Sequence, residues 1–163
     1  MKLSVIIANY NYRDFVGAAI SSALAVNWPD KEVIVVDDAS TDDSRNVIDG
    51  FRGRVAAYFR PKSYQLGAHI FGFEQSTGNV IIFLDADDLL EPKGHARGRK
   101  GVKGVSKVQY RMNLIRRHRQ PVGIRFPPKD NPDKLRARIY DQGIGQRLCS
   151  RLRDVFALNR TGD

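Results

Sequence analysis

The stretch Val80-Ile81-Ile82-Phe83-Leu84-Asp85-Ala86-Asp87-Asp88 changes abruptly from apolar to acidic. Five large apolar residues, preceded by the turn-forming segment Thr77-Gly78-Asn79, predict a strand buried on both faces, as in a parallel sheet covered by helices. In open α/β sheets, ligands bind beyond the carboxyl ends of the strands. Carboxylates gathered there repel one another unless a cation compensates them. The stretch therefore predicts a site for a hard metal ion.

The spacing of the acidic residues supports a metal site. Side chains alternate along an extended chain, so Asp85 and Asp87 can project to the same side and share one ion. One or two carboxylates, completed by phosphates and water, are the ligands that Mg²⁺ or Mn²⁺ prefers. Phosphates are therefore the implied partner. The alternative, which stays open at this point, is that Asp87-Asp88 only forms a solvated turn that caps the next segment.

Two earlier segments have the same form as this strand and its acidic end. Lys31-Glu32-Val33-Ile34-Val35-Val36 is a β-branched run followed by Asp37-Asp38, and Leu3 to Ala8 is a strand followed by Asn9-Tyr10-Asn11. Helices are expected after both, with N-caps at Asp14 and at Ser40, the latter in a near capping box with Asp43. Asp42 and Asp43 are interpreted as surface charges at a helix start.

The order of elements then predicts the fold class. Val55 to Phe59 is expected to form another strand and Leu66 to Ser76 another helix, so strands and helices alternate up to Glu91. Such alternation indicates a parallel, doubly wound sheet, which is a nucleotide-binding architecture. Because no glycine-rich phosphate loop follows the first strand, phosphate binding has to depend on something else, for which a metal at Asp85 and Asp87 is the obvious substitute.

Three segments also resemble the leading signatures of family 2 glycosyltransferases. They are Ser4 to Asn11, Asp37 to Asp42 and Phe83 to Asp88, and their order and spacing match. The resemblance implies the GT-A fold, a Rossmann-like, open and mostly parallel sheet flanked by helices. It further implies metal-assisted, inverting transfer of a sugar from a nucleoside diphosphate donor, expected to be a UDP-sugar, to an acceptor hydroxyl, with Mg²⁺ or Mn²⁺ bridging the diphosphate.

The resemblance also implies roles for individual residues. Tyr10 would pack against the nucleobase, Asp38 would accept its imide hydrogen, Asp85 would lie against the ribose and sugar, and Asp87 would ligate the metal. For each of these residues, the alternative is a role in the fold and not in binding. Tyr10 can be a core-edge residue, and Asp38 can be a helix-entry carboxylate favoured by the helix dipole.

This chain departs from the family pattern at two of the expected donor contacts. Ala8-Asn9 stands where members usually have a proline ahead of Thr/Ser-Tyr-Asn, and Ala68-His69-Ile70 stands where they usually have Ala-Arg-Asn. Ala8 and His69 are therefore predicted contacts of the nucleotide sugar with altered chemistry, since histidine is only partly charged near neutral pH. A plain surface or core histidine is the alternative for His69.

Charge divides the chain into two halves. Up to Pro92 there are 8 basic and 13 acidic residues, and from Lys93 onward there are 19 and 5, within a formal net charge of +9. We expect a nucleotide-sugar-binding half over 1–92, a basic, glycine-rich linker or loop over 93–104, and an incomplete, partly disordered acceptor-side region over 105–163. In the last region Val105 to Met112 resembles an acceptor-side strand of the family.

No residue is assigned as the general base, which in the family is a carboxylate of the second half. Asp141 and Asp154 are isolated acids among arginines and can be ordinary salt-bridge partners. Two other functions therefore stay open beside glycosyl transfer. One is a catalytically inactive fragment that binds nucleotide sugars, and the other is a basic protein that binds anionic surfaces.

Partners and location follow from the remaining features of the sequence. The basic half can contact anionic lipid headgroups at the inner membrane, whereas no nucleic-acid-binding motif accompanies the charge. Neither a secretory signal nor an apolar stretch of about 20 residues is present, so a cytoplasmic protein is expected. Cys149 is the only cysteine, which excludes disulfides within the chain, and it is assigned no role.

Overall fold

The structure, a computed structural model, describes residues 1–92, 112–115 and 120–126. The strands are β1 (Leu3–Asn9), β2 (Lys31–Asp38), β3 (Ala56–Arg60), β4 (Val80–Asp85), β5 (Met112–Ile115) and β6 (Pro121–Phe126). The helices are α1 (Arg13–Leu24), α2 (Ser44–Asp49) and α3 (Tyr64–Glu74). Strands β1 to β4 form one sheet, in the order β3-β2-β1-β4, and all of its pairs are parallel.

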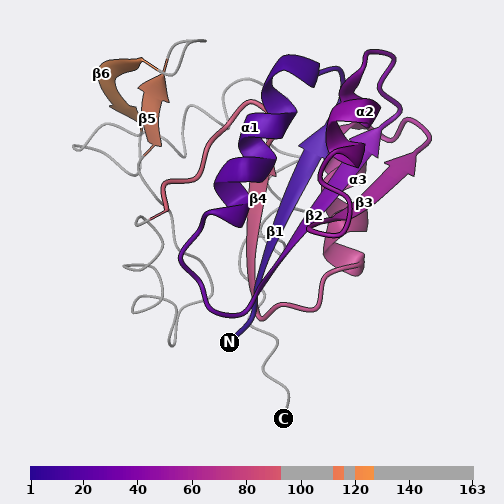
Figure 1. The fold of residues 1–163 in the computed structure, drawn as a ribbon, viewed down its shortest axis with the longest axis horizontal. Coiled ribbons are helices and arrows are strands. Elements are labelled where there is room, and N and C mark those ends of the chain that lie inside the picture. Colours follow the sequence, from indigo (N-terminus) through magenta and orange to yellow (C-terminus); the bar gives the residue numbers. More distant parts are fainter. Residues whose placement is uncertain (93–111, 116–119, 127–163) are drawn as a thin grey trace, which may run out of the picture. The chain divides into compact units, whose positions relative to one another are not determined.

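This sheet confirms the predicted fold class. Its four strands run in the same direction, so their carboxyl ends share one edge (Figure 1). The chain adds β2 and β3 on one side of β1 and then crosses to add β4 on the other side. The topological switch point, where ligands bind in folds of this kind, therefore lies between β1 and β4.

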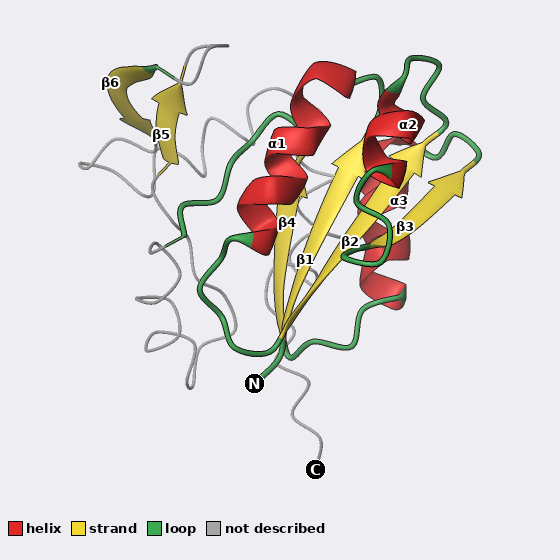
Figure 2. Ribbon diagram, in the orientation of Figure 1, coloured by secondary structure: helices red, strands yellow, loops and turns green. Residues whose placement is uncertain are grey.

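Helices cover both faces of the sheet and create two hydrophobic clusters (Figure 2). Helices α1 and α2 pack on one face, where Val16, Ile20 and Ile48 meet alternate residues of the strands. Helix α3 packs on the other face through Ala68 against Ile6, Ile34 and Val36. Successive side chains of β1 and β2 point to opposite faces of the sheet and so enter different clusters. Because both faces are covered, the sequences of these strands are continuous apolar runs.

Helix α3 approaches the sheet closely because it carries a glycine at the contact. A Cβ atom at Gly72 would overlap the Ile6 side chain and would come within 3.2 Å of Val36 Cγ2. The absence of a side chain at Gly72 therefore sets the distance of α3 from β1 and β2.

Three sequence expectations need correction. Strand β4 is less buried than predicted, with Leu84 alone fully buried, because it is an edge strand within the described residues. The predicted N-caps are also wrong. Helix α1 begins at Arg13 after Tyr12, so Asp14 lies inside its first turn, and α2 begins at Ser44 after Asp43 rather than after Ser40. Asp42 is half-buried and accepts hydrogen bonds from the backbone of Arg13 and Ser44, so it is not a simple surface charge.

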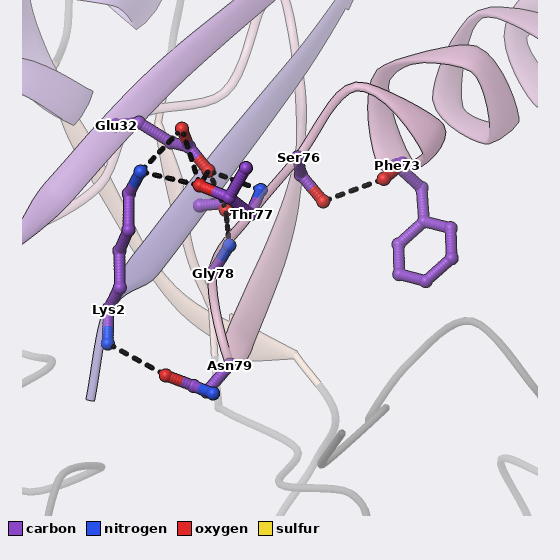
Figure 3. A network of polar contacts seen from close by, with 8 residues as sticks. Lys2, Glu32, Phe73, Ser76, Thr77, Gly78 and Asn79 are labelled. Atoms are coloured by element: carbon purple, nitrogen blue, oxygen red, sulfur yellow. Dashed lines mark hydrogen bonds and ion pairs between the residues drawn. The ribbon is translucent and has the colours of Figure 1, made fainter. Parts of the chain in front are cut away.

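The amino edge of the sheet carries a closed polar network (Figure 3). Glu32 Oε2 lies 2.8 Å from Lys2 Nζ, while Glu32 Oε1 accepts hydrogen bonds from Ser4 Oγ at 2.6 Å and from the Thr77 backbone at 2.7 Å. Although burial opposes it, these hydrogen bonds hold the pKa of Glu32 at about 2. Gly78 completes the network by donating to Ser4 Oγ at 2.9 Å. The network ties the β4 start to β1 and β2.

Beyond Pro92, the described residues form an antiparallel pair, β5 with β6, which is considered by itself. The predicted linker 93–104, most of the predicted acceptor-side region, and Asp141, Cys149 and Asp154 lie outside the described residues. The division at residue 92 therefore stays a prediction. In the described part of the chain, no helix has the length and apolar character that a membrane span requires.

Candidate functional site

The carboxyl edge of the parallel sheet brings together residues from all three segments that the sequence singled out. In the strand register, Ala8 is the partner of Asp85, Asn9 is the partner of Asp37, and Asp38 is the partner of Arg60. Asp38 and Asp85 therefore lie on opposite sides of β1, at the ends of β2 and β4. This edge holds the candidate site.

Two loops at this edge are fastened to each other by side-chain hydrogen bonds. The Asp37 carboxylate accepts from Asn9 Nδ2 at 2.7 Å and from both the backbone and the hydroxyl of Ser40. Asn11, whose φ is 57°, accepts from the Thr41 backbone at 2.7 Å. Ser40 thus joins two loops instead of capping a helix. The hydrogen-bonded loops form a frame around Tyr10, which stays 43% exposed.

Asp38 is a buried carboxylate whose two oxygens have different partners. Oδ1 accepts hydrogen bonds from the Ser63 backbone at 2.5 Å and from Ser63 Oγ at 2.7 Å. Oδ2 forms an ion pair with Lys62 Nζ at 3.3 Å, but it lacks a properly directed hydrogen bond within the described residues. Although burial opposes it, Ser63 and Lys62 lower the pKa of Asp38, which keeps it ionised.

The turn that supplies these partners is held against α3 by a glycine. A Cβ atom at Gly67 would lie 2.7 Å from Ser63 Cβ and 2.8 Å from Ser63 Oγ, so only glycine lets Ser63 fold over the first turn of the helix. The next residue, Tyr64, has a φ of 62° and is 75% exposed. A bulky residue in the left-handed region is a genuine outlier.

Lys62 also connects the carboxylate to the aromatic residues at this edge. Its ammonium lies over the Tyr10 ring, 2.7 Å from the centroid, and 5.8 Å from the Tyr64 centroid. Because the same ammonium pairs with Asp38, it lies between Asp38 Oδ2 and the face of the Tyr10 ring. The space that the ammonium occupies therefore has an aromatic ring on one side and a carboxylate on another.

The end of β4 carries the acidic cluster. Gln65 Nε2 donates to Asp85 Oδ1 at 2.6 Å, while the Asp88 backbone N–H donates to the Asp85 carbonyl at 3.0 Å and closes a turn. Burial, together with the nearby charges of Asp85 and Asp87, raises the pKa of Asp88. Asp87 is exposed. The turn predicted as an alternative does form, and it gathers mutually repelling carboxylates at the switch point.

His69 is a buried neighbour of this cluster. Only 8% of it is exposed, its ring meets Phe83 edge to face at 5.1 Å, and its Nε2 has no hydrogen-bond partner within the described residues. Burial lowers the pKa of His69, against the attraction of Asp85 and a backbone hydrogen bond to Leu84. The imidazole is therefore neutral at pH 7, unlike the arginine that it replaces in the family pattern.

The predicted residues thus fall into two adjoining groups, one with Tyr10 and Asp38 and one with Asp85, Asp87 and His69, with Ala8 beside Asp85 in the sheet. Sequence reasoning missed three residues that contact these groups, namely Lys62 and Ser63 of the β3–α3 turn and Gln65 at the start of α3. The available signal was Pro61 followed by a polar pair, which marks a turn after a strand.

Solved structures with this fold include glycosyltransferases. S. aureus TarS 1-349 matches 63% of this chain and 32% of its own at 25% identity with a TM-score of 0.56, and it has also been solved with UDP-GlcNAc. The mannosyltransferase PcManGT of Pyrobaculum calidifontis, solved with GDP-Man and Mn²⁺, matches 70% of this chain and 35% of its own at 21% identity with a TM-score of 0.55. The second likeness shows the fold alone.

Curated relatives match the same part of the chain. An uncharacterized glycosyltransferase of Nostoc sp. is 45% identical over 96 residues, 56% of this chain and 30% of the relative. The GalNAc(5)-diNAcBac-PP-undecaprenol β-1,3-glucosyltransferase of Campylobacter jejuni is 35% identical over 95 residues, 55% of this chain and 30% of the relative. The chain thus spans about a third of the length of these relatives. The family model described as Glycosyl transferase family 2 matches residues 4–97, more than half of the chain, and the chain therefore belongs to this family.

Proposed function

We propose that residues 1–92 bind a UDP-sugar donor for transfer, with inversion at the anomeric carbon, to an acceptor hydroxyl. The observation that carries the proposal is that Oδ2 of buried Asp38 has no hydrogen bond within the described residues and lies near the exposed Tyr10. A planar base that stacks on Tyr10 would present its edge to this oxygen, and an imide N–H would satisfy it. Family membership and the UDP-GlcNAc complex of TarS support the same donor class.

The state of Asp38 favours uracil over guanine. Ser63 occupies Oδ1 with two hydrogen bonds, which leaves Oδ2 as the acceptor for a ligand. Uracil presents one imide N–H between two carbonyl oxygens, so it needs one acceptor and gains from a neighbouring donor such as the Lys62 ammonium. Guanine presents two adjacent donors and would use both carboxylate oxygens. Asp38 with one free oxygen therefore fits uracil better.

The acidic cluster suits a divalent cation in its chemistry. Asp87, with Asp85 beside it, supplies hard carboxylate oxygens whose mutual repulsion a cation would relieve, as the raised pKa of Asp88 indicates. In the described part of the chain, no group of three or more acidic, histidine or cysteine residues can hold a metal alone. Diphosphate and water would complete the ligand set. A bound Mg²⁺ or Mn²⁺ would neutralise the charge of the leaving diphosphate.

The other residues of this group act on the sugar side of the donor. Asp85 is held by Gln65 through one oxygen, which keeps its carboxylate at the switch point where ribose and sugar hydroxyls would donate to it. Ala8 lies beside Asp85 and leaves room for the nucleotide backbone. His69 would offer its unpartnered Nε2 to the donor as a neutral group.

Calorimetric titration of UDP into the purified chain, with and without Mn²⁺, tests the proposal. We expect saturable binding that requires Mn²⁺, and we expect Asp87→Asn to lower the affinity at least ten-fold, because a charge-assisted metal ligand is lost. Asp30→Asn, another exposed aspartate, should leave the affinity unchanged. UDP-GlcNAc and UDP-glucose would then be screened for turnover with lipid-linked acceptors, the acceptor class in the name of the Campylobacter relative.

The outcomes separate the three functions that the sequence left open. Binding without turnover of any sugar would indicate an inactive nucleotide-sugar-binding fragment. Absence of UDP binding in both conditions would contradict the proposal and direct attention to anionic surfaces as ligands of the basic second half. Binding of UDP that is independent of Mn²⁺ and of Asp87 would retain the base site and refute the metal site.

A further inference from the structure

We propose that Tyr64 is a second stacking wall for the nucleobase, opposite Tyr10, and that Lys62 fills the slot between the two rings until a base replaces it. The inference rests on the proposed nucleotide-sugar site and adds to it a residue that sets affinity and selectivity for flat, conjugated bases. Three features support this role: the position of the Lys62 ammonium, the exposure and backbone of Tyr64, and the anchoring of the turn before α3.

The position of the ammonium sets an upper limit on the distance between the two rings. Lys62 Nζ is 2.7 Å from the Tyr10 centroid and 5.8 Å from the Tyr64 centroid, so the two rings can be no farther apart than these distances combined. A base held between two rings needs about 7 Å, because each stacking contact takes about 3.5 Å. The two tyrosines are therefore close enough for one aromatic layer to span the distance between them.

The same ammonium also marks where the edge of the base would lie. Lys62 Nζ is 3.3 Å from Asp38 Oδ2, the oxygen that lacks a hydrogen bond within the described residues. A base that takes the place of the ammonium on the Tyr10 face would thus have its edge at this oxygen. Stacking and hydrogen bonding can be satisfied together at one position.

The backbone of Tyr64 gives an independent reason to assign it a ligand. A bulky side chain at a φ of 62° is strained, and such strain persists where function requires it. Glycine would adopt this conformation without cost. Tyr64 is 75% exposed, so burial in the described part of the chain offers little compensation. A binding role accounts for a tyrosine at this position.

The turn that carries Lys62 and Tyr64 is anchored at the base-binding carboxylate. Ser63, between them, donates two hydrogen bonds to Asp38 Oδ1 and is held in place by its close contact with Gly67. The Tyr64 backbone is therefore positioned before a ligand arrives. Pre-organisation of this kind lowers the entropic cost of binding.

Two ligands and two variants test the slot by calorimetry in the presence of Mn²⁺. The ligands are UDP and 5,6-dihydro-UDP, which keeps the imide N–H and both carbonyls but loses the flat, conjugated ring. We expect wild type to prefer UDP by about ten-fold, within the range of one stacking contact. Tyr64→Gly should bind UDP about ten-fold more weakly and keep only the part of this preference that stacking on Tyr10 supplies, whereas Tyr64→Phe should behave as wild type.

Thermal melting separates a stacking role from a structural one. Because glycine relieves the strain at position 64, Tyr64→Gly should melt at the same temperature as wild type or higher, even as its affinity falls. Tyr12→Ala is the matched control, since Tyr12 is 40% exposed and its ring packs on Phe15 instead of Lys62. This control should keep both the affinity and the preference of wild type.

Three results would overturn the slot. Retention of wild-type affinity and preference by Tyr64→Gly, while Asp38→Asn loses UDP binding, would refute the slot and leave the proposed function intact. Equal weakening of both ligands by Tyr64→Gly would indicate a positioning role without stacking. Absence of saturable UDP binding by wild type would overturn the proposed function, and the slot with it.

Discussion

Glu32 at the amino edge of the parallel sheet differs from Asp38 and Asp88 at its carboxyl edge in how fully each carboxylate is stabilised. At the amino edge, Glu32 is neutralised by Lys2 and receives hydrogen bonds from Ser4 and Thr77 (Figure 3). At the carboxyl edge, Asp38 keeps an oxygen without a hydrogen bond within the described residues, and Asp88 lies among like charges. Both edges are built from ends of the same strands.

The difference in hydrogen bonding separates polar groups that stabilise the fold from polar groups that are available to a ligand. A carboxylate whose acceptors are all used lowers the free energy of the folded state, as the low pKa of Glu32 shows. Asp38 is stabilised as an anion by Ser63 and Lys62, but its Oδ2 has only the ion pair with Lys62 and can still accept a hydrogen bond from a ligand. The amino edge is therefore expected to contribute to stability and the carboxyl edge to binding, and substitutions at each edge can test the division.

The largest expected effect on stability is at the amino edge. Glu32→Gln removes the charge that faces Lys2 and weakens the hydrogen bonds from Ser4 and Thr77, so the free energy of unfolding should fall by about 2 kcal/mol at pH 7. Urea denaturation of both proteins measures the difference. Glu74→Gln, an exposed glutamate on α3, should change stability by less than about 0.5 kcal/mol.

The pH dependence sharpens this test. The folded pKa of Glu32, about 2, lies below its usual value of 4.5, so its contribution is complete above pH 4.5 and is lost as the pH falls toward 2. Denaturation curves of wild type and Glu32→Gln should therefore converge in this range. A constant difference between them from pH 6 to pH 3 would contradict the assignment.

A smaller effect is expected from His69 at the carboxyl edge. Because burial lowers its pKa from 6.5, the unfolded chain binds a proton more readily than the folded chain below that pH. The contribution of neutral His69 is complete above pH 6.5 and falls as the pH drops through the folded pKa. Between pH 7.5 and 5.5, wild type should lose up to about 1 kcal/mol more stability than His69→Gln. Equal losses in both proteins would show that His69 does not titrate in this range.

The sequence predicted the framework of both edges, because apolar runs with period-two packing are local signals. It also placed Tyr10, Asp38 and Asp85 at the carboxyl edge, since each follows such a run. It failed where the hydrogen-bond partner of a side chain is distant in sequence. The sequence predicts Ser40 as a helix cap, but its hydroxyl accepts a hydrogen bond from Asn9, 31 residues away.

The β3–α3 turn shows the same limit. Ser63 reaches Asp38, which is 25 residues away, and it does so only because Gly67 leaves room for it and α3 packs on the sheet. No local sequence pattern predicts this contact between Ser63 and Asp38. The left-handed backbone of Tyr64 is also invisible in the sequence, because tyrosine is not a residue that favours this conformation.

The smallest predicted effect has the opposite sign and tests the carboxyl edge most directly. Burial and the charges of Asp85 and Asp87 raise the pKa of Asp88, so its ionised form destabilises the fold, and stability should rise as the pH falls toward its folded pKa. In metal-free buffer at pH 7, Asp88→Asn should stabilise the protein by less than about 1 kcal/mol, because Asp88 keeps enough solvent contact for its charge to be screened. Urea denaturation with Asp30→Asn as the control measures the gain. Added Mn²⁺ would compensate the same repulsion, so it should narrow the difference between variant and wild type. A loss of stability in Asp88→Asn would mean that this aspartate is held as Glu32 is, and the contrast between the two edges would fail at its acidic end.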